Sequence, residues 1–217
     1  MSRPLVISDC DEVLLHMIAP FRTWLGETQG VTFTMQGNDF ARSMRWTATG
    51  EQVEPAEIWR LLNLFFAEGM DRQYPIAGAV EAMGALSEVA DIVVLTNIGD
   101  DHRVRRTEQL LGHGLNLKVY TNLGPKGPAL SRILDEYRPS RAVFIDDLAQ
   151  HHQSVADGSP DVFRLHLCGE PDLAPHIPCA HDAGHAHARI DDWASALPWL
   201  LDRLASPTDR ATTGETA

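Results

Sequence analysis

The sequence is poor in cysteine and has no long apolar run. Cys10, Cys168 and Cys179 are odd in number and lack a tight metal-binding spacing, so a disulfide framework has no support and a reducing compartment is favoured. No apolar stretch approaches membrane-spanning length, and the segment before Asp9 is too short for the apolar part of a signal peptide. We therefore expect a cytoplasmic protein without a membrane partner.

Positive charge is also scarce. The formal net charge is −12 over 217 residues, and the 18 cationic side chains include only two lysines, Lys118 and Lys126. This excess of negative charge disfavours a nucleic acid polymer as a partner, although a local basic pocket can still bind an anionic metabolite. The apolar fraction of 44% and the charged fraction of 22% are ordinary for a folded protein, so a packed core is expected.

Short apolar runs alternate with helical patterns along most of the chain. The runs, which are rich in β-branched and aromatic residues, span 4–8, 92–96, 117–120, 142–146 and 162–167. Apolar residues at helical spacing span 79–89, 104–111, 129–137 and 193–204. This alternation predicts an α/β fold with a Rossmann-like, doubly wound parallel sheet of about five strands.

A long insertion separates the first two predicted strands. We expect a core domain over 1–14 and 75–205, a small helical cap over 15–74, and a flexible tail over 206–217. Helices are predicted in the cap over 21–25, 40–46 and 55–66. Its arginines and aromatic residues either contact a ligand or form the solvated face and the interior of the cap. They are Arg22, Arg42, Arg45, Arg60, Arg72, Trp24, Trp46, Trp59, Phe65 and Phe66.

Polar residues follow the predicted strands, at the edge where a doubly wound sheet binds its ligands. They are Asp9, Asp11, Thr96, Asn97, Lys126, Asp146 and Asp147. Four carboxylates in one crevice cannot all be ionised without a cation, and oxygen ligands select Mg²⁺. Magnesium with one lysine suits a phosphoryl group, which one carboxylate can attack while a second moves the proton.

The order of these residues resembles the haloacid dehalogenase superfamily, over about residues 4 to 204. Its four motifs match Asp9-Cys-Asp11-Glu-Val, Thr96, Lys126 and Asp146-Asp147. The resemblance implies that Asp9 is a nucleophile that becomes an aspartyl phosphate, and that Asp11 protonates the leaving group and then activates water. It also implies that Asp9, Asp146 and the Asp11 main-chain carbonyl hold Mg²⁺. Asp147 would assist the metal shell or orient Lys126, and Thr96 with the Asn97 backbone would bind phosphoryl oxygens.

The expected function is that of a magnesium-dependent phosphomonoester hydrolase acting on a small phosphorylated metabolite. Asp11 disfavours a haloacid dehalogenase, because a leaving alkoxide needs a proton and a leaving halide does not. The same residues are compatible with phosphosugar mutase-type phosphoryl transfer and with a non-enzymatic phosphoaspartate switch. The motifs leave the leaving group and the oligomeric state open.

Two further features each allow two interpretations. Glu12 stands where the superfamily often has glycine, and it is either a surface residue or a gate at the crevice. Zinc ligands are offered by four residues within nine positions, Cys179, His181, His185 and His187. Because no second ligand pair lies on a distant element, we expect a surface loop near the crevice, with a structural zinc site as the alternative.

Overall fold

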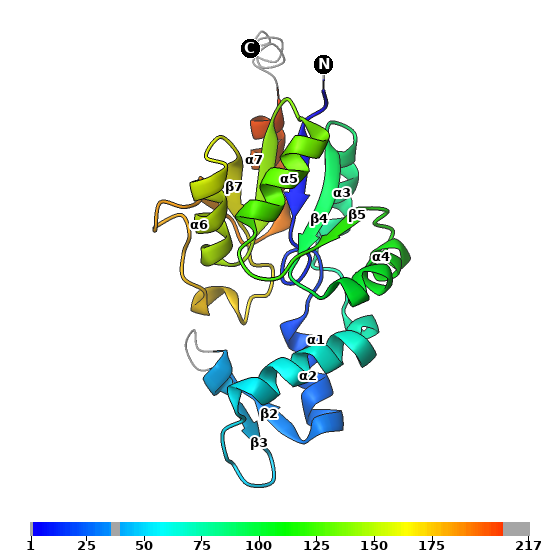
Figure 1. Cartoon of the computed structure of the whole chain (residues 1–217), viewed down its shortest axis with the longest axis vertical. Helices are drawn as coiled ribbons and strands as arrows, with labels where there is room; N and C mark the ends of the chain where they lie inside the picture. The colour runs from blue at the N-terminus through cyan, green and yellow to red at the C-terminus, as the bar shows by residue number, and fades with distance from the viewer. Residues whose placement is uncertain (1, 36–39, 206–217) are drawn as a thin grey trace.

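A six-stranded parallel sheet forms the centre of the computed structural model, which describes residues 2–35 and 40–205 (Figure 1). The strand order is β5-β4-β1-β6-β7-β8. The strands are β1 (Leu5–Ser8), β4 (Asp91–Thr96), β5 (Lys118–Thr121), β6 (Ala142–Asp146), β7 (Phe163–His166) and β8 (Ala188–Arg189). The predicted α/β fold with a parallel sheet is confirmed. It has one strand more than expected, because the two residues of β8 are too few to show a strand pattern.

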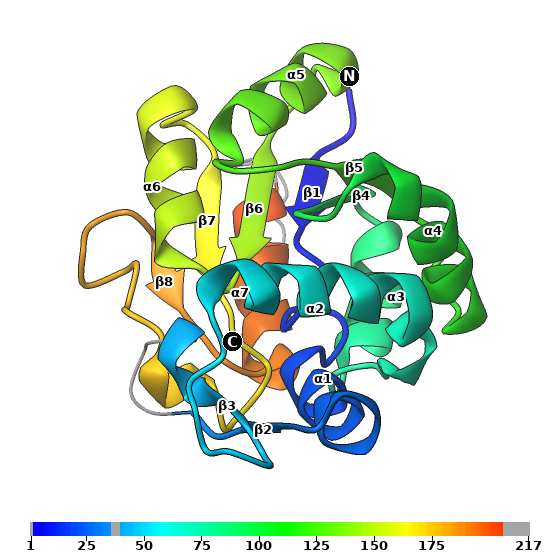
Figure 2. The same cartoon turned by 60° about the horizontal axis from the view of Figure 1, so that its bottom comes forward.

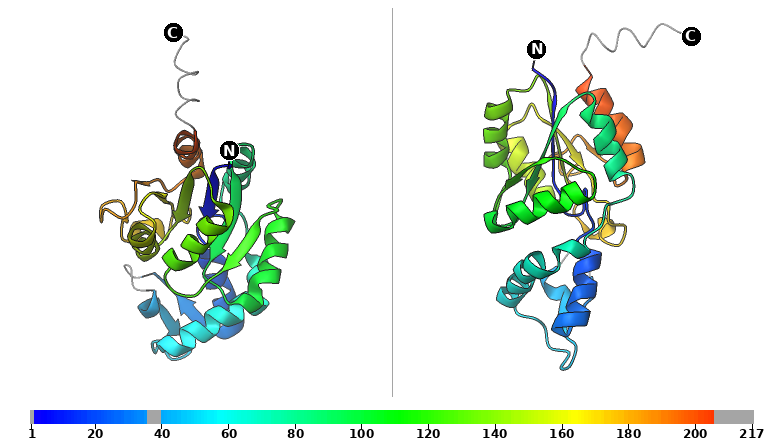
Figure 3. Two further views of the ribbon diagram at one scale, coloured as in Figure 1. Left: turned by 45° about the horizontal axis from the view of Figure 1, so that its top comes forward. Right: turned by 90° about the vertical axis from the view of Figure 1, so that its right-hand side faces the viewer.

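Helices cover both faces of the sheet. They are α3 (Ala79–Ser87), α4 (Arg103–Gly112), α5 (Gly127–Tyr137), α6 (Ala149–Gly158) and α7 (Trp193–Leu204). Figure 3 shows α5 and α6 on one side of the sheet and α3 and α7 on the other. Side chains of a strand alternate between its faces, so Val6 packs in the cluster with α3 and α7, whereas Leu5 and Ile7 pack in the cluster with α5 and α6. Burial on both faces explains why the strands read as continuous apolar runs.

The carboxyl ends of the strands face the inserted segment. Figure 2 shows the arrowheads of β6 and β7 pointing toward α2 (Pro55–Glu68). The chain runs outward from β1 through β4 to β5, and then returns to build β6, β7 and β8 on the other side of β1. Such a reversal of strand order leaves a crevice at the carboxyl edge, where ligands bind in open α/β sheets.

The cap, as we call residues 15–74, combines helices with a small hairpin. It contains α1 (Ile18–Trp24), the π-helical turn η1 (Leu25–Gln29), β2 (Val31–Phe33), the 3₁₀ turn η2 (Ala41–Ser43), β3 (Met44–Trp46) and α2. The predicted helix over 40–46 is wrong, because β3 pairs antiparallel with β2. Val31, Phe33 and Met44 are buried while Thr32 and Arg45 are exposed, which is the alternation of a strand.

Aromatic side chains fill the interior of the cap. Phe21 packs against Trp24, Phe33 and Phe65, with ring centroids 5.3 to 6.2 Å apart. Ile98 of the core belongs to the same apolar cluster, which joins the cap to the sheet. No described helix is long and apolar enough to cross a membrane. The predicted tail, 206–217, lies outside the described residues.

Candidate active site

Lys126 lies at the centre of the carboxyl edge of the sheet. It immediately precedes α5, its side chain is fully buried, and its Nζ lies 2.8 Å from Oδ2 of Asp9 and 2.6 Å from Oδ2 of Asp146. Asp9 follows β1 and Asp146 ends β6, and these strands are parallel neighbours. The fold therefore brings Lys126 and Asp146 to Asp9, from which both are more than 100 positions distant along the chain.

Thr96, Asn97 and Asp147 line a cavity between this edge and the cap, together with Asp9 and Asp11. The Asn97 side chain is already engaged there. Its Nδ2 donates to the Gly124 carbonyl at 2.9 Å. Its Oδ1 also accepts a hydrogen bond, at 2.9 Å, from the side-chain amide of Asn122. These bonds fix the loop before Lys126 against the end of β4.

The pKa values of the buried acidic residues are shifted in different directions. Burial raises the pKa of Asp9 to about 7, although Lys126 opposes the shift. It also raises the pKa of Asp147 well above its usual value, and the negative charges of Asp146 and Asp9 add to that rise. Burial acts in the same sense on Asp146, but Lys126 and two histidines outweigh it and lower the pKa of Asp146.

The chemistry of this group fits a divalent cation. Asp9, Asp146 and Asp147 each place one carboxylate oxygen within 4.8 Å of the others, and all three are buried. Three carboxylates face one ammonium group, that of Lys126, so negative charge is in excess. Buried, hard oxygen donors with surplus negative charge are the ligands of Mg²⁺ and Ca²⁺. The Asp11 carboxylate is not part of this group.

Instead, the Asp11 side chain is paired with Arg106, which was not predicted from the sequence. Nη2 of Arg106 lies 3.0 and 3.1 Å from the two Asp11 oxygens, and Nε2 of Gln73 donates to Oδ1 at 2.6 Å. Arg106 is fully buried on α4. It lies four residues before the buried Leu110, and this helical spacing was the available signal that its side chain faces inward.

Comparison with known proteins gives structural matches alone. No protein-family model matches the sequence, and curated proteins give no match. A haloacid dehalogenase-like hydrolase from Streptococcus pneumoniae superposes with a TM-score of 0.64 at 11% identity, covering 92% of this chain and 98% of its own. A haloacid dehalogenase family hydrolase from Deinococcus radiodurans, with bound phosphate and sodium, gives 0.64 at 18% identity, covering 94% and 97%. A protein named provisionally as a β-phosphoglucomutase from Thermotoga maritima gives 0.62 at 14% identity, covering 92% and 99%.

These superpositions cover more than nine tenths of each chain. The chain has the haloacid dehalogenase-like fold. Identities of 11 to 18% establish that fold and leave the reaction to be inferred from the site. In this haloacid dehalogenase-like core, the four motif positions named from the sequence lie along one edge of the sheet, at or after the ends of β1, β4, β5 and β6.

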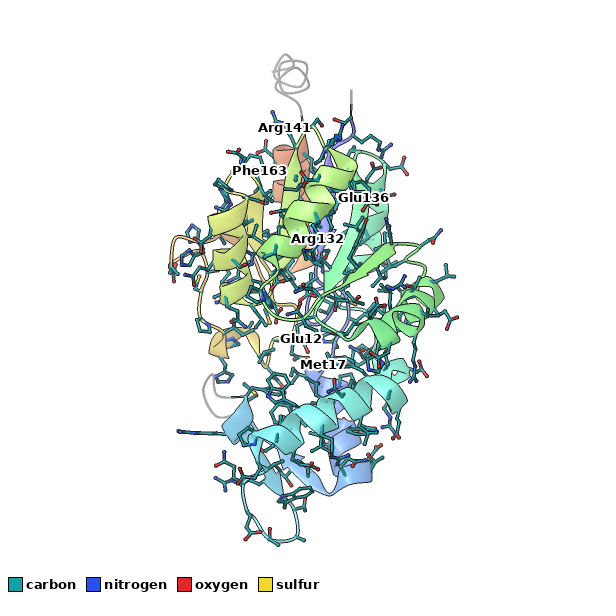
Figure 4. The ribbon with its side chains drawn as sticks, viewed as in Figure 1. Glu12, Met17, Arg132, Glu136, Arg141 and Phe163 are labelled. Carbon is teal, nitrogen blue, oxygen red and sulfur yellow. The ribbon has the colours of Figure 1, made fainter. Side chains whose placement is uncertain are left out.

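Glu12 joins this core to the cap. Its side chain is 2% exposed, and Oε1 accepts hydrogen bonds from the backbone N–H groups of Met17 and Ile18, where α1 begins. Figure 4 shows Glu12 and Met17 at the junction of core and cap. Burial raises the pKa of Glu12 to about 8. With His16 and Glu170 it forms a second cluster of three candidate ligand atoms within 4.8 Å of one another, so Glu12 is not a surface residue.

The histidine-rich loop gives no metal cluster in the described part of the chain. The two groups of three candidate ligands found there do not include any of its residues. His187 accepts a hydrogen bond at Nδ1 from the Arg164 backbone, and His181 lies on the surface beside Asp182. His176 and Pro178, just before the loop, line the cavity. The loop therefore begins beside the candidate site.

Proposed function

We propose that this chain is a magnesium-dependent phosphomonoester hydrolase that acts on a small phosphorylated metabolite through an aspartyl phosphate on Asp9. Asp9 lies beside a buried cation and lines the cavity, so a phosphoryl group bound there has a carboxylate within reach. Thr96, the Asn97 backbone and Lys126 bind the phosphoryl oxygens, and Asp9, Asp146, Asp147 and the Asp11 carbonyl hold Mg²⁺. In this proposal residues 15–74 form a cap subdomain over the core.

The first half-reaction transfers the phosphoryl group to the enzyme. A carboxylate oxygen of Asp9 attacks phosphorus, and the bond from phosphorus to the leaving-group oxygen breaks. Asp11, which lines the same cavity, gives its proton to that oxygen, so the leaving group departs as an alcohol. Lys126 balances the charge of the two carboxylates beside the reacting group.

The second half-reaction returns Asp9 to its starting state. Asp11, now ionised, takes a proton from a water molecule, whose oxygen attacks phosphorus and releases inorganic phosphate. Arg106 and Gln73 hold the Asp11 carboxylate in place through their hydrogen bonds to its oxygens. Bound Mg²⁺ would supply electrostatic stabilisation of the charge that develops on the phosphoryl oxygens.

The observation that carries this proposal is the placement of Lys126 between Asp9 and Asp146, with Asp147 adjoining them. The test is phosphate release from a panel of phosphate esters, with Mg²⁺ and with EDTA. Asp9→Asn is expected to abolish release, and Asp11→Asn to lower kcat by roughly 100-fold or more. Asp135→Asn, on the exposed face of α5, is the control and should behave as wild type. Release that survives Asp9→Asn contradicts the mechanism.

Two alternatives give different products from the same phosphoaspartate. A phosphosugar mutase returns the phosphoryl group to another hydroxyl, so an isomerised sugar phosphate appears instead of inorganic phosphate. A non-enzymatic switch keeps its phosphoaspartate for minutes.

The cysteines at positions 10, 168 and 179 are all free. A cytoplasmic location and a soluble metabolite as the partner remain part of this proposal.

A further inference from the structure

The cavity above the acidic cluster is large and has apolar walls. Its volume is about 760 Å³, within the usual range of small-molecule sites. The acidic residues form its floor. Side chains from both the cap and the core form its walls, and they include Ile18, Leu62, Phe66, Leu148, Leu173 and Ile177. A phosphoryl group on Asp9 leaves most of this volume for the rest of the substrate.

Lys126 is buried beside Asp9 at the acidic cluster, and no lysine or arginine side chain lines the cavity itself, as far as the described residues go. The cap arginines considered as ligands for an anionic substrate lie elsewhere. Arg60 pairs with Glu57 at 2.7 Å, and Arg72 pairs with Glu27 at 2.6 Å. Arg22 lies 3.6 Å from Asp172, and Nη1 of Arg45 donates to the Gly50 carbonyl. These contacts place Arg45, Arg60 and Arg72 on the outside of the cap and hold Arg22 against Asp172 of the core, and none of the four lines the cavity.

The aromatic residues of the cap lie in two different places. Trp24 and Phe65 belong to the cap interior, whereas Trp59 and Phe66 line the cavity. The Trp59 side chain is large and 62% exposed, which is unusual for a tryptophan without a partner. A flat apolar ligand entering the cavity would cover this ring.

From these walls we infer that the substrate is the phosphomonoester of a bulky, apolar and uncharged alcohol or phenol. The inference rests on the proposed phosphatase function. A carboxylate on the leaving group would lose its hydration without gaining a lysine or arginine partner, and it would approach the carboxylates of the floor. An apolar group gains binding energy from every wall it covers. The cavity therefore selects substrates by excluding charge as well as by filling space.

Matched substrates separate these two effects. The panel consists of methyl, benzyl, 4-carboxybenzyl and naphthylmethyl phosphate, assayed with Mg²⁺. We expect kcat/KM to rise about tenfold or more from methyl to benzyl phosphate and to rise again for naphthylmethyl phosphate. The remote carboxylate of 4-carboxybenzyl phosphate should lower kcat/KM on the order of 100-fold relative to benzyl phosphate. Cyclohexylmethyl phosphate distinguishes an aromatic preference from a general apolar one.

A positive charge placed in the wall should weaken the discrimination against the carboxylate. Leu62→Arg introduces a cation on the cavity side of α2, and we expect the ratio of kcat/KM for benzyl over 4-carboxybenzyl phosphate to fall at least about tenfold. Asn63→Arg adds the same charge at the neighbouring exposed position and should leave the ratio unchanged. If Leu62→Arg does not fold, Trp59→Ala provides the test at an exposed site. It should lower kcat/KM for naphthylmethyl phosphate more than for methyl phosphate.

The outcomes distinguish this inference from the function on which it rests. If no ester of the panel releases phosphate with Mg²⁺, both the proposed function and the inference fail. If methyl phosphate is hydrolysed in an Asp9-dependent way but 4-carboxybenzyl phosphate equals or exceeds benzyl phosphate, the function stands and the inference is overturned. It is also overturned if Leu62→Arg and Asn63→Arg change the ratio equally, because the effect would then be long-range electrostatics.

Discussion

At the scale of single residues, Lys126 holds two carboxylates that would otherwise repel each other. Its Nζ contacts Asp9 and Asp146, and none of its surface reaches solvent. Lys126→Met keeps the length of the side chain and removes its charge. We expect kcat/KM to fall by roughly 100-fold or more, because the charge beside the phosphoryl group is lost.

The same substitution should affect stability in a pH-dependent way. Without Lys126, Asp9 and Asp146 are harder to ionise in the folded chain, so the variant should lose about 3 kcal/mol of unfolding free energy at pH 8. The deficit should narrow at pH 5, where the carboxyl groups can be protonated. Urea unfolding at both pH values measures it, and a deficit that grows toward pH 5 would contradict this account.

Arg106 gives a second prediction at this scale. Its guanidinium group is fully buried, bonds to both Asp11 oxygens and lies 3.1 Å from the sulfur of Cys10. Arg106→Met leaves the Asp11 carboxylate without its cation, and we expect the unfolding free energy to fall by about 3 kcal/mol. Arg103→Met removes an exposed arginine from the same helix, and there the loss should stay below about 0.5 kcal/mol. Equal losses in chemical denaturation would count against the assigned role of Arg106.

At the scale of elements, Glu12 controls how the cap helix begins. The backbone of Glu12 is left-handed, with φ of 59°, and its carboxyl accepts the first N–H groups of α1. Glu12→Ala leaves those groups without an acceptor and should cost about 1 to 2 kcal/mol. Hydrogen exchange at Met17 and Ile18 should become faster, whereas Glu12→Gln keeps an acceptor and most of the protection.

Glu88→Ala, at an exposed position at the end of α3, is the control for Glu12→Ala. It should change neither the free energy of unfolding nor hydrogen exchange at the start of α1. If Glu12→Ala leaves exchange at Met17 and Ile18 at the wild-type rate, Glu12 does not hold the junction of core and cap.

Elements differed in how well the sequence specified them. The run Ala142–Asp146 is apolar up to its final aspartate and became β6 with those bounds, and the helical pattern over 193–204 became α7 with its predicted bounds. The helix expected over 40–46 failed because a strand of three residues shows too short an alternation to outweigh helical spacing. Its pairing with β2 depends on a turn and on contacts that periodicity does not encode.

The site residues also differ in how far the sequence could predict them. Asp9, Thr96, Lys126 and Asp146 lie at or after the ends of strands, so the topology of a parallel sheet was enough to bring them to one edge. Arg106 and Gln73 reach Asp11 from a helix and from the end of the cap, across more than 60 positions of sequence. Such long-range partners follow from tertiary packing, and the sequence pattern offered little to assign them.

At the scale of the whole molecule, the buried carboxyl groups link stability to pH and to metal binding. Burial raises the pKa of Asp9 to about 7 and that of Glu12 to about 8, and the pKa of Asp147 is raised as well. The folded chain therefore holds protons that the unfolded chain releases near pH 4. The stability that these protons contribute is lost as the pH rises through the folded pKa values.

The free energy of unfolding, measured in EDTA, should accordingly fall from pH 6.5 to pH 8.5. Burial lowers the pKa of four histidines, which opposes this trend, but they are largely neutral in both the folded and the unfolded chain over most of this window. They are His151, His152, His166 and His187. Mg²⁺ should stabilise the chain more at pH 8.5 than at pH 6.5, since it replaces protons on the acidic cluster. Equal stabilisation at the two pH values would show that the cation does not bind at this cluster.

The central claim is that Asp9 carries the phosphoryl group during turnover. Acid quenching of a reaction with benzyl phosphate and Mg²⁺, followed by mass spectrometry of the proteolytic peptides, tests it most directly. We predict one phosphoryl group on the peptide that contains Asp9, which appears during turnover, disappears when substrate is exhausted and is absent in Asp9→Asn. Phosphate release with no phosphorylated carboxylate, or with the phosphoryl group on a residue other than Asp9, would contradict the account.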